Sequence, residues 1–347
     1  MRALVIHEPG RAAIEHIAPP EAGAGEVLVR SGVVGLCGTD LKILRGDHPM
    51  PLVQYPCIPG HEWTGIVEKV SGPVDLSVGD RVVIESRIPC ARCARCASGA
   101  TNLCIAYEEV GFTRPGGCAE LVAVPGRVAH PLPEGVAMDR GALVEPAATV
   151  VRAFQRAGGA QGRTVGVVGI GAVGSIAILV ARIQGATEVV AFGSRPAEIE
   201  AAGRLGASAA FLLPDSDPRE IREAIDEGLD LVLEAAGAPQ AIRQAIDLAR
   251  RGGTVAILGT VGGGRLLEIP ADTLMRKDLQ VLGLLSYTTA SFTEAVRLTR
   301  AGLDLERVVA ARFPLDQFQD AFALMQDSAA SVAGRILLEN GSDPPRR

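Results

Sequence analysis

Two short stretches near the amino terminus carry side chains that bind zinc in enzymes. The first, Cys37-Gly-Thr-Asp40, offers a thiol, a hydroxyl and a carboxylate, and the second, Gly60-His-Glu62, offers an imidazole and another carboxylate. Thiolate, imidazole and carboxylate are the ligand types of catalytic zinc sites. The alternative is a buried cysteine and a core histidine that never meet. A four-cysteine cluster, a dinucleotide fingerprint and an acid at Glu145 favour the metal site.

The four-cysteine cluster lies within one loop and has the spacing C-x2-C-x2-C-x7-C. Its members are Cys90, Cys93, Cys96 and Cys104. Four thiolates this close together favour a closed, tetrahedral, structural zinc site. An iron–sulfur cluster is the competing metal group, whereas a redox C-x-x-C pair would need no third and fourth cysteine. We therefore predict a structural zinc that holds a loop with little apolar material of its own.

A glycine-rich turn in the middle of the chain matches a dinucleotide-binding fingerprint. The sequence G-x-G-x-x-G follows an apolar run at 163–168 and precedes an apolar helix predicted over 175–184. In that context the glycines allow a tight turn and bring backbone N–H groups close to a pyrophosphate. A later glycine, after another predicted strand, lies at the sheet edge where such folds bind ligands. The residues predicted to contact the cofactor are Gly169, Gly171, Ala172, Val173, Gly174 and Gly259.

The end of the next predicted strand indicates which cofactor is used. An enzyme that binds NAD usually presents an Asp or Glu there to the ribose 2′-hydroxyl. This chain has Gly193-Ser194-Arg195 instead, so a hydroxyl and a guanidinium are available for a 2′-phosphate. We therefore predict NADP. The alternative is that Arg195 is a solvated surface residue and that NAD is bound without the carboxylate.

The elements that must position these residues are of two kinds. Short apolar runs separated by Gly, Pro and Asp turns make the amino-terminal part β-rich, and barrel- or sandwich-like. Strands alternate with helices afterwards, which predicts an α/β, doubly wound, parallel sheet. We expect residues 1–147 to form a catalytic domain that includes the four-cysteine loop. Residues 148–289 would then form the nucleotide-binding domain, and residues 290–347 would return to the first domain.

Composition limits the classes of partner. The chain of 347 residues has a formal net charge of −6 and no long basic run, which argues against nucleic acid and against a membrane surface. No apolar stretch is long enough to span a bilayer. The first residues read as a strand rather than a signal peptide. We expect a cytoplasmic protein whose cysteines serve metal and thiol chemistry rather than disulfides.

Together, the order and spacing of these motifs resemble the zinc-dependent medium-chain dehydrogenases along nearly the whole chain. The resemblance is greater to the polyol, threonine and sugar dehydrogenase branch than to alcohol dehydrogenases that place a cysteine at the position of Glu145. It implies a GroES-like β domain joined to a Rossmann domain. It also implies a small-molecule alcohol or ketone as substrate, and assembly into a homodimer or homotetramer.

The resemblance implies roles for individual residues. Cys37 and His61 match catalytic zinc ligands, with Glu62 or Glu145 completing the set directly or through water. Thr39 matches the hydroxyl that relays the substrate proton, and Glu62 stands beside the ligands in the catalytic group. Many members carry a relay histidine three residues further on, where this chain has a lysine at position 42. The four clustered cysteines match the structural zinc.

These parts predict hydride transfer between a secondary alcohol and a nicotinamide cofactor, with zinc polarising the alcohol oxygen. The alcohol would be a polyol, sugar, cyclitol or amino alcohol. One alternative is zinc-free reduction of an enone or quinone on the same scaffold. Another is a non-catalytic NADP-binding protein, since a fold does not guarantee activity. The intact ligands at Cys37, His61 and Glu145 argue against both alternatives.

Overall fold

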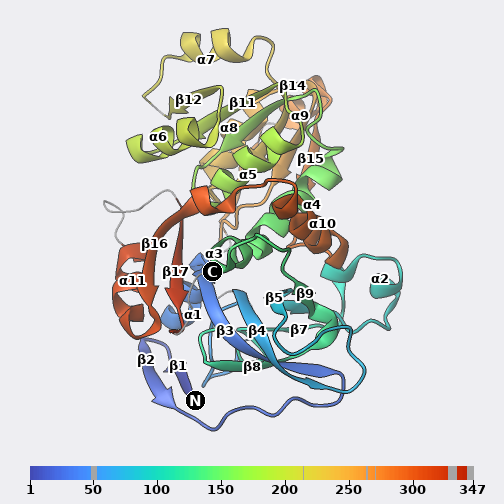
Figure 1. Ribbon diagram of the computed structural model, residues 1–347. Helices are drawn as coiled ribbons and strands as arrows, with labels where there is room; N and C mark the ends of the chain where they lie inside the picture. The colour runs from blue at the N-terminus through green and yellow to red at the C-terminus, as the bar shows by residue number, and fades with distance from the viewer. Residues whose placement is uncertain (48–52, 214, 263–264, 270, 327–333, 342–347) are drawn as a thin grey trace.

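The computed structural model describes residues 1–47, 53–213, 215–262, 265–269, 271–326 and 334–341. The chain forms two lobes, each built on its own large sheet (Figure 1). One lobe contains the amino-terminal strands together with the last strands of the chain, and the other contains the middle of the chain. The predicted combination of a β-rich part with a doubly wound parallel sheet is confirmed.

The first lobe contains a seven-stranded sheet in the order β16-β17-β3-β4-β5-β9, with β8 also paired to β3. Side chains on β3 alternate between buried and partly buried along much of its length, the period-two pattern of a strand with one face in a core. The sheet strands are β3 (Glu26–Leu36), β4 (Glu62–Ser71), β5 (Arg81–Ile84), β8 (Leu121–Pro125), β9 (Ala129–Pro131), β16 (Val309–Pro314) and β17 (Arg335–Glu339). Two small sheets pair β1 (Arg2–Glu8) with β2 (Arg11–His16), and β6 (Arg87–Ile88) with β7 (Glu108–Glu109).

The second lobe contains a six-stranded, wholly parallel sheet in the order β12-β11-β10-β13-β14-β15. Counted along the chain this is 3-2-1-4-5-6, the doubly wound order that binds dinucleotides where the strand order reverses. The strands are β10 (Thr164–Val168), β11 (Glu188–Gly193), β12 (Ala209–Leu212), β13 (Leu229–Glu234), β14 (Ala249–Ile257) and β15 (Gln280–Gly283). The helices between them are α5 (Ala172–Ile183), α6 (Pro196–Leu205), α7 (Pro218–Ile225), α8 (Pro239–Leu248) and α9 (Ala271–Lys277).

Helix α5 begins at Ala172, three residues before the start predicted from the apolar pattern. Gly171 is its N-cap, so the second half of the glycine motif belongs to the first helical turn. A Cβ at Gly174 would lie 1.9 Å from the carbonyl oxygen of Gly169. Only glycine therefore lets the helix start this close to the end of β10.

Two helices pack against each other where the lobes meet, α4 (Val144–Ala157) and α10 (Thr289–Arg300). Most side chains of α4 are buried, and the helix ends at Gly158, which has a left-handed φ of 86°. Helix α4 shares one apolar core with the parallel sheet. The remaining helical elements are α1 (Gly38–Arg45), α2 (Ala94–Ala97), α3 (Met138–Ala142), α11 (Phe318–Gln326), η1 (Thr101–Leu103), η2 (Gly126–Val128), η3 (Leu305–Val308) and η4 (Leu315–Gln317).

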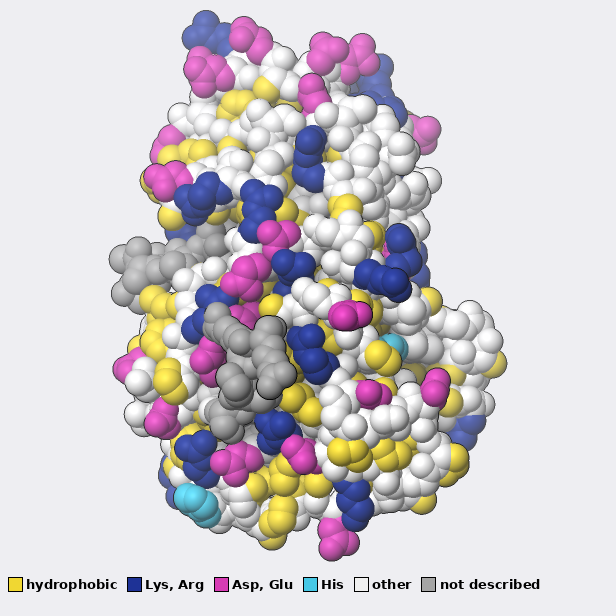
Figure 2. All heavy atoms as spheres, viewed as in Figure 1, with side chains coloured by type: hydrophobic (Ala, Val, Ile, Leu, Met, Phe, Trp, Pro, Cys, Tyr) yellow, Lys and Arg dark blue, Asp and Glu magenta, His cyan; other side chains and the backbone are white. Residues whose placement is uncertain are grey.

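The surface is mixed in charge on the face drawn in Figure 2, where Lys and Arg are interspersed with Asp and Glu. No broad area of a single sign stands out on that face. Among the described residues, no helix is both long enough and apolar enough to cross a membrane.

Candidate active site and metal centres

Cys37, His61 and Glu62 converge in the first lobe. One ligand atom from each lies within 4.8 Å of the other two. Cys37 is the N-cap of α1, while Glu62 is the first residue of β4. The close approach depends on Gly60, whose φ is 99° and whose Cβ would lie 2.9 Å from the Cys118 sulfur.

A buried carboxylate holds the two stretches of chain together. Asp40 Oδ2 accepts a hydrogen bond of 2.8 Å from the backbone N–H of Cys37, and Oδ1 accepts one of 3.3 Å from that of Gly60. Asp40 Oδ1 also lies 3.3 Å from His61 Nδ1, an electrostatic contact rather than a well-aligned hydrogen bond. The side chain of Asp40 is wholly buried. It therefore sets the orientation of the imidazole from behind.

An arginine from the far end of the chain completes this cluster, and the sequence reasoning missed it. Arg335, the first residue of β17, lies with Nη2 3.0 Å from Glu62 Oε1 and donates from Nη1 to the carbonyl of Leu36 at 3.1 Å. Both Arg335 and Glu62 are buried. The one available signal was a charged residue directly before the apolar run Ile336-Leu-Leu338.

Burial and these charges shift the protonation of the cluster. Burial by itself would raise the pKa of the Cys37 thiol, but the charges of Arg335 and His61 lower that pKa to about 6. Burial raises the pKa of Glu62 to about 8, against the opposing charge of Arg335. A thiol that ionises this readily is the form of cysteine that binds metal.

Glu145, in the first turn of α4, stands apart from the tight group of three. Burial, reinforced by the charge of Glu62, raises the pKa of Glu145 to about 7. Its Oε1 accepts a hydrogen bond of 3.4 Å from Ser86 Oγ. Of the two glutamates considered from the sequence, Glu62 therefore has the closer approach to Cys37 and His61.

The donor set fits a catalytic zinc. A thiolate, an imidazole and a carboxylate oxygen are three protein ligands, which leaves a fourth position for water or substrate. Glu62 Oε2 is also buried without a hydrogen-bond partner, as expected of an oxygen that a cation would satisfy.

The predicted proton relay begins close to this group. The Cys37 thiol lies 3.7 Å from Thr39 Oγ1, and Thr39 is partly exposed. Lys42 follows one turn later on α1 and is also partly exposed. The hydroxyl therefore stands between the buried cluster and solvent.

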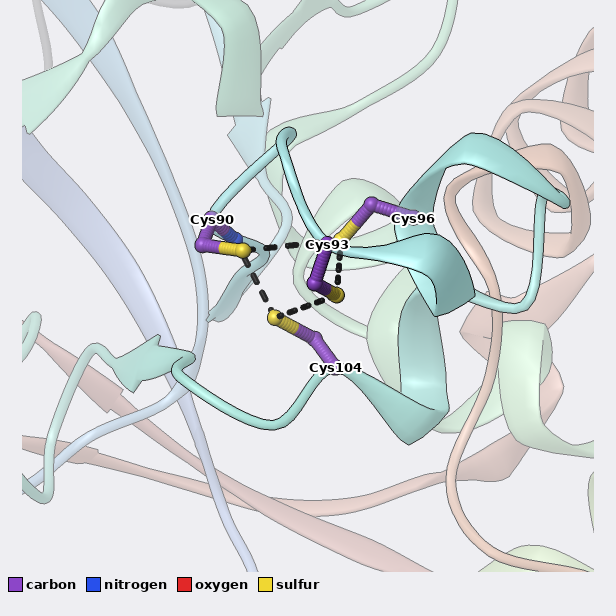
Figure 3. Close-up of side chains that lie close together, drawn as sticks. All are labelled: Cys90, Cys93, Cys96 and Cys104. Atoms are coloured by element: carbon purple, nitrogen blue, oxygen red, sulfur yellow. Dashed lines mark hydrogen bonds between the residues drawn. The ribbon is translucent and has the colours of Figure 1, made fainter.

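The four clustered cysteines converge as the sequence predicts (Figure 3). The sulfur of Cys93 lies 3.5 Å from that of Cys96 and 3.9 Å from that of Cys104, and the Cys90 and Cys96 sulfurs are 4.0 Å apart. A tetrahedral zinc with bonds of about 2.3 Å places its sulfurs about 3.8 Å apart. Backbone N–H groups of Cys96 and Ile105 lower the pKa of Cys93 to about 6. The site fits a closed structural zinc.

The predicted cofactor residues gather at the carboxyl edge of the parallel sheet. Gly169 has a φ of 89°, and its Cβ would lie 2.6 Å from that of Ala236. Gly259 approaches Gly237 so closely that a Cβ would lie 2.2 Å from its nitrogen. Ala172 and Val173 form the first turn of α5 with partly exposed side chains, and their position is set by the helix start described above. Three loops therefore meet at a helix N-terminus, which attracts phosphate.

Gly193-Ser194-Arg195 carries no acid, as the sequence indicated, but a carboxylate from the next helix reaches this end of β11. Glu198, the third residue of α6, folds back as its capping residue. Its Oε2 accepts from the backbone N–H groups of Ser194 at 2.7 Å and Arg195 at 3.2 Å. Its Oε1 binds the guanidinium of Arg195 at 2.7 Å. A glutamate three residues after an N-cap was a detectable signal.

Comparisons with known proteins cover nearly the whole chain. The alcohol dehydrogenase GroES-like domain family matches residues 23–134, and the zinc-binding dehydrogenase family matches residues 172–301. An L-threonine 3-dehydrogenase of Anaeromyxobacter sp. (strain K) is 32% identical over 95% of each chain. A sorbitol dehydrogenase of Bacillus subtilis (strain 168) is 30% identical over 92% of each chain. The crystal structure of a putative zinc-binding dehydrogenase from Sinorhizobium meliloti 1021, bound to NADP, superposes with a TM-score of 0.90 at 29% identity, covering 97% of this chain and 98% of the other.

Proposed function

The chain belongs to the zinc-dependent medium-chain alcohol dehydrogenases, and we propose that it transfers a hydride between a secondary alcohol and NADP. The alcohol is a polyol, a sugar alcohol or an amino alcohol, the substrate classes named in its relatives. Membership confirms the resemblance seen in the motifs. The observation that carries the proposal is the convergence of Cys37, His61 and Glu62, with their ligand atoms within 4.8 Å of one another.

In the proposed reaction Cys37, His61 and Glu62 hold a catalytic zinc, and Glu145 is a further carboxylate beside them whose pKa responds to the charges of Glu62 and His61. The zinc, when bound, supplies Lewis acidity to the alcohol oxygen. Thr39 accepts the proton of the substrate hydroxyl and passes it toward solvent. Asp40 and Arg335 hold the imidazole and the Glu62 carboxylate in place. The buried position of the cluster keeps water from the carbon that gives up hydride.

The parallel sheet holds the cofactor in this proposal. Backbone N–H groups at the start of α5 face the pyrophosphate, and the loop at Gly259 lies beside it. Ser194 and Arg195 bind the 2′-phosphate of NADP. Glu198 pairs with the guanidinium of Arg195 and fixes its position. The choice of NADP over NAD rests on Ser194 and Arg195 as donors to the phosphate, which outweigh the negative charge of Glu198 in this proposal. Residues 1–147 with 290–347 make the catalytic domain, and residues 148–289 make the cofactor domain.

We also propose that the protein is a homodimer. Strand β15 is the last in its sheet and pairs only with β14 among the described residues. Two apolar side chains beside this edge are well exposed, Val281 at 40% and Leu285 at 51%. An exposed apolar edge strand is a template for pairing with another chain, and two copies related by a two-fold axis would cover both edges. A monomer by light scattering would contradict this, while a tetramer would mean that a further interface exists.

The cytoplasmic location of the protein stays a prediction.

The test of function is a substrate screen combined with metal analysis. The purified protein is assayed with polyols, sugars, cyclitols, amino alcohols and simple alcohols, each with NAD and with NADP. We expect oxidation of at least one polyol or amino alcohol, and two zinc ions per chain. Cys37→Ser is the matched control, because it should lose one zinc and all turnover while the four-cysteine site keeps its metal. A zinc-loaded protein that oxidises no alcohol would refute the proposal.

A further inference from the structure

The segment between β15 and α10 joins the cofactor sheet to the interface between the lobes. It contains Ser286, whose φ of 49° lies in the left-handed region that non-glycine residues avoid. A strained backbone of this kind persists only where its surroundings hold it. The residues on either side of Ser286 are each anchored by a hydrogen bond, and both anchors come from the first lobe.

One set of anchors comes from the four-cysteine loop. Asn102 lies between the third and fourth cysteines, and its Nδ2 donates to the carbonyl of Leu285 at 2.8 Å. The preceding Thr101 accepts at Oγ1 from the backbone N–H of Thr289 at 2.9 Å. The carbonyl of Asn102 in turn accepts from buried Arg87 at 2.7 Å. Figure 1 shows the loop around α2 lying beside α10, as these contacts require.

The second anchor leads to the candidate active site. Tyr287 is 1% exposed, and its hydroxyl lies 2.9 Å from Ser86 Oγ. Because Ser86 donates its proton to Glu145 Oε1, the tyrosine hydroxyl is the donor to Ser86. Thr289 Oγ1 donates to Glu85 Oε1 at 2.7 Å, which fixes the next turn of the segment. A continuous path of hydrogen bonds therefore runs from the segment to Glu145.

We propose that Asn102 is a positioning residue through which the four-cysteine loop sets the place of Tyr287, and thereby of Glu145. The loop holds the carbonyl of Leu285, Ser286 takes its left-handed conformation, and the tyrosine hydroxyl is thereby brought to Ser86. In this proposal the four-cysteine loop contributes to the rate of turnover as well as to the stability of the fold. This inference rests on the proposed alcohol dehydrogenase activity. It connects the four-cysteine loop, which lies outside the catalytic cluster, to Glu145 through a defined series of hydrogen bonds.

The test uses the full-length, zinc-loaded protein and three single variants. Tyr287→Phe removes only the hydroxyl, Asn102→Ala removes only the anchor, and Ser98→Ala is the matched control in the same loop, where the hydroxyl donates to a carbonyl at the surface. We expect the first two to lower kcat by about tenfold, equivalent to 1.36 kcal/mol, with the KM for the cofactor unchanged. The double variant of Asn102 and Tyr287 should lose no more than the larger single loss, because both act on one path.

A second readout is independent of activity. Amide hydrogen exchange of the peptide 284–290 should be faster in Asn102→Ala than in the wild type and unchanged in Ser98→Ala. The proposal is overturned if Tyr287→Phe keeps the wild-type kcat, if the two losses are additive, or if exchange in Asn102→Ala is unchanged. Failure of the proposed function looks different: the wild type itself would oxidise no alcohol, while the exchange experiment would still decide whether Asn102 holds the segment.

Discussion

Replacing Arg195 by alanine tests the cofactor assignment at the point where the structure is most specific. Arg195 is the N-cap of α6, directly after β11, where the ribose of a dinucleotide is read. Its Nε and Nη2 lie 3.2 and 2.7 Å from Glu198 Oε1. The arginine side chain is 32% exposed, whereas that of Glu198 is 7% exposed. The carboxylate of Glu198 therefore holds the guanidinium at the sheet edge, where the arginine side chain stays accessible to solvent and to a cofactor.

The magnitude follows from this environment. A hydrogen bond to a charged group contributes roughly 1.5–3 kcal/mol to binding. Exposure of a third of the side chain, and the charge shared with Glu198, place Arg195 at the low end of that range. A loss of about 1.4 kcal/mol is a factor of about ten. We therefore expect Arg195→Ala to lower kcat/KM for NADP about tenfold, chiefly through KM, and to leave kcat/KM for NAD nearly unchanged.

The assay is steady-state kinetics with both cofactors at saturating alcohol. Arg204→Ala is the matched control, because Arg204 lies on the same helix with a side chain 71% exposed. Arg195→Lys should give an intermediate loss, since it keeps the charge but not the planar fork. Equal or better use of NAD by the wild type, or an unchanged NADP preference in Arg195→Ala, would refute the reasoning.

The structure also rules out a simpler design. The sequence suggests Gly193→Asp as a way to shift preference toward NAD, because NAD enzymes carry an acid at the end of this strand. A Cβ there would lie 3.0 Å from both Cβ and Oε2 of Glu198, so the new side chain would displace the residue that holds Arg195. Its effect on cofactor choice could not be separated from that displacement.

The remaining predictions concern the metal sites and their support. Cys37→Ser or His61→Ala should abolish turnover while NADPH binding, followed by nicotinamide fluorescence, survives; turnover in either folded variant would contradict the catalytic-zinc assignment. Cys96→Ser should lose one zinc and lower the melting temperature, and a variant with full metal content and an unchanged melting temperature would show that the loop is not a zinc site. Arg335→Met should cost about 3–5 kcal/mol of stability by leaving Glu62 buried and unpaired; Arg335→Met combined with Glu62→Gln should recover part of that loss in thermal unfolding.

Local patterns in the sequence were sufficient for the zinc and dinucleotide motifs. The spacing of Cys90 to Cys104 predicts a closed four-sulfur cluster, because a short loop keeps all four thiols within reach of a single metal ion. The glycines from Gly169 to Gly174 predict a strand–turn–helix, and the structure shows that a side chain at Gly169 or Gly174 would meet a neighbouring part of the chain. Alternation of strands and helices predicts the parallel sheet, since side-chain periodicity is a property of neighbouring residues.

Only the tertiary structure decided which distant residues support these motifs. Arg335 reaches Glu62 because β17 pairs with β3, and Tyr287 reaches Ser86 because the lobes meet along α4 and α10. The approach of Glu62 rather than Glu145 to Cys37 depends on the same packing. The sequence determines periodicity and local spacing, because these act within a few residues. Long-range pairing depends on strand order and on the burial of charges between elements, and these become definite only when the whole core is assembled.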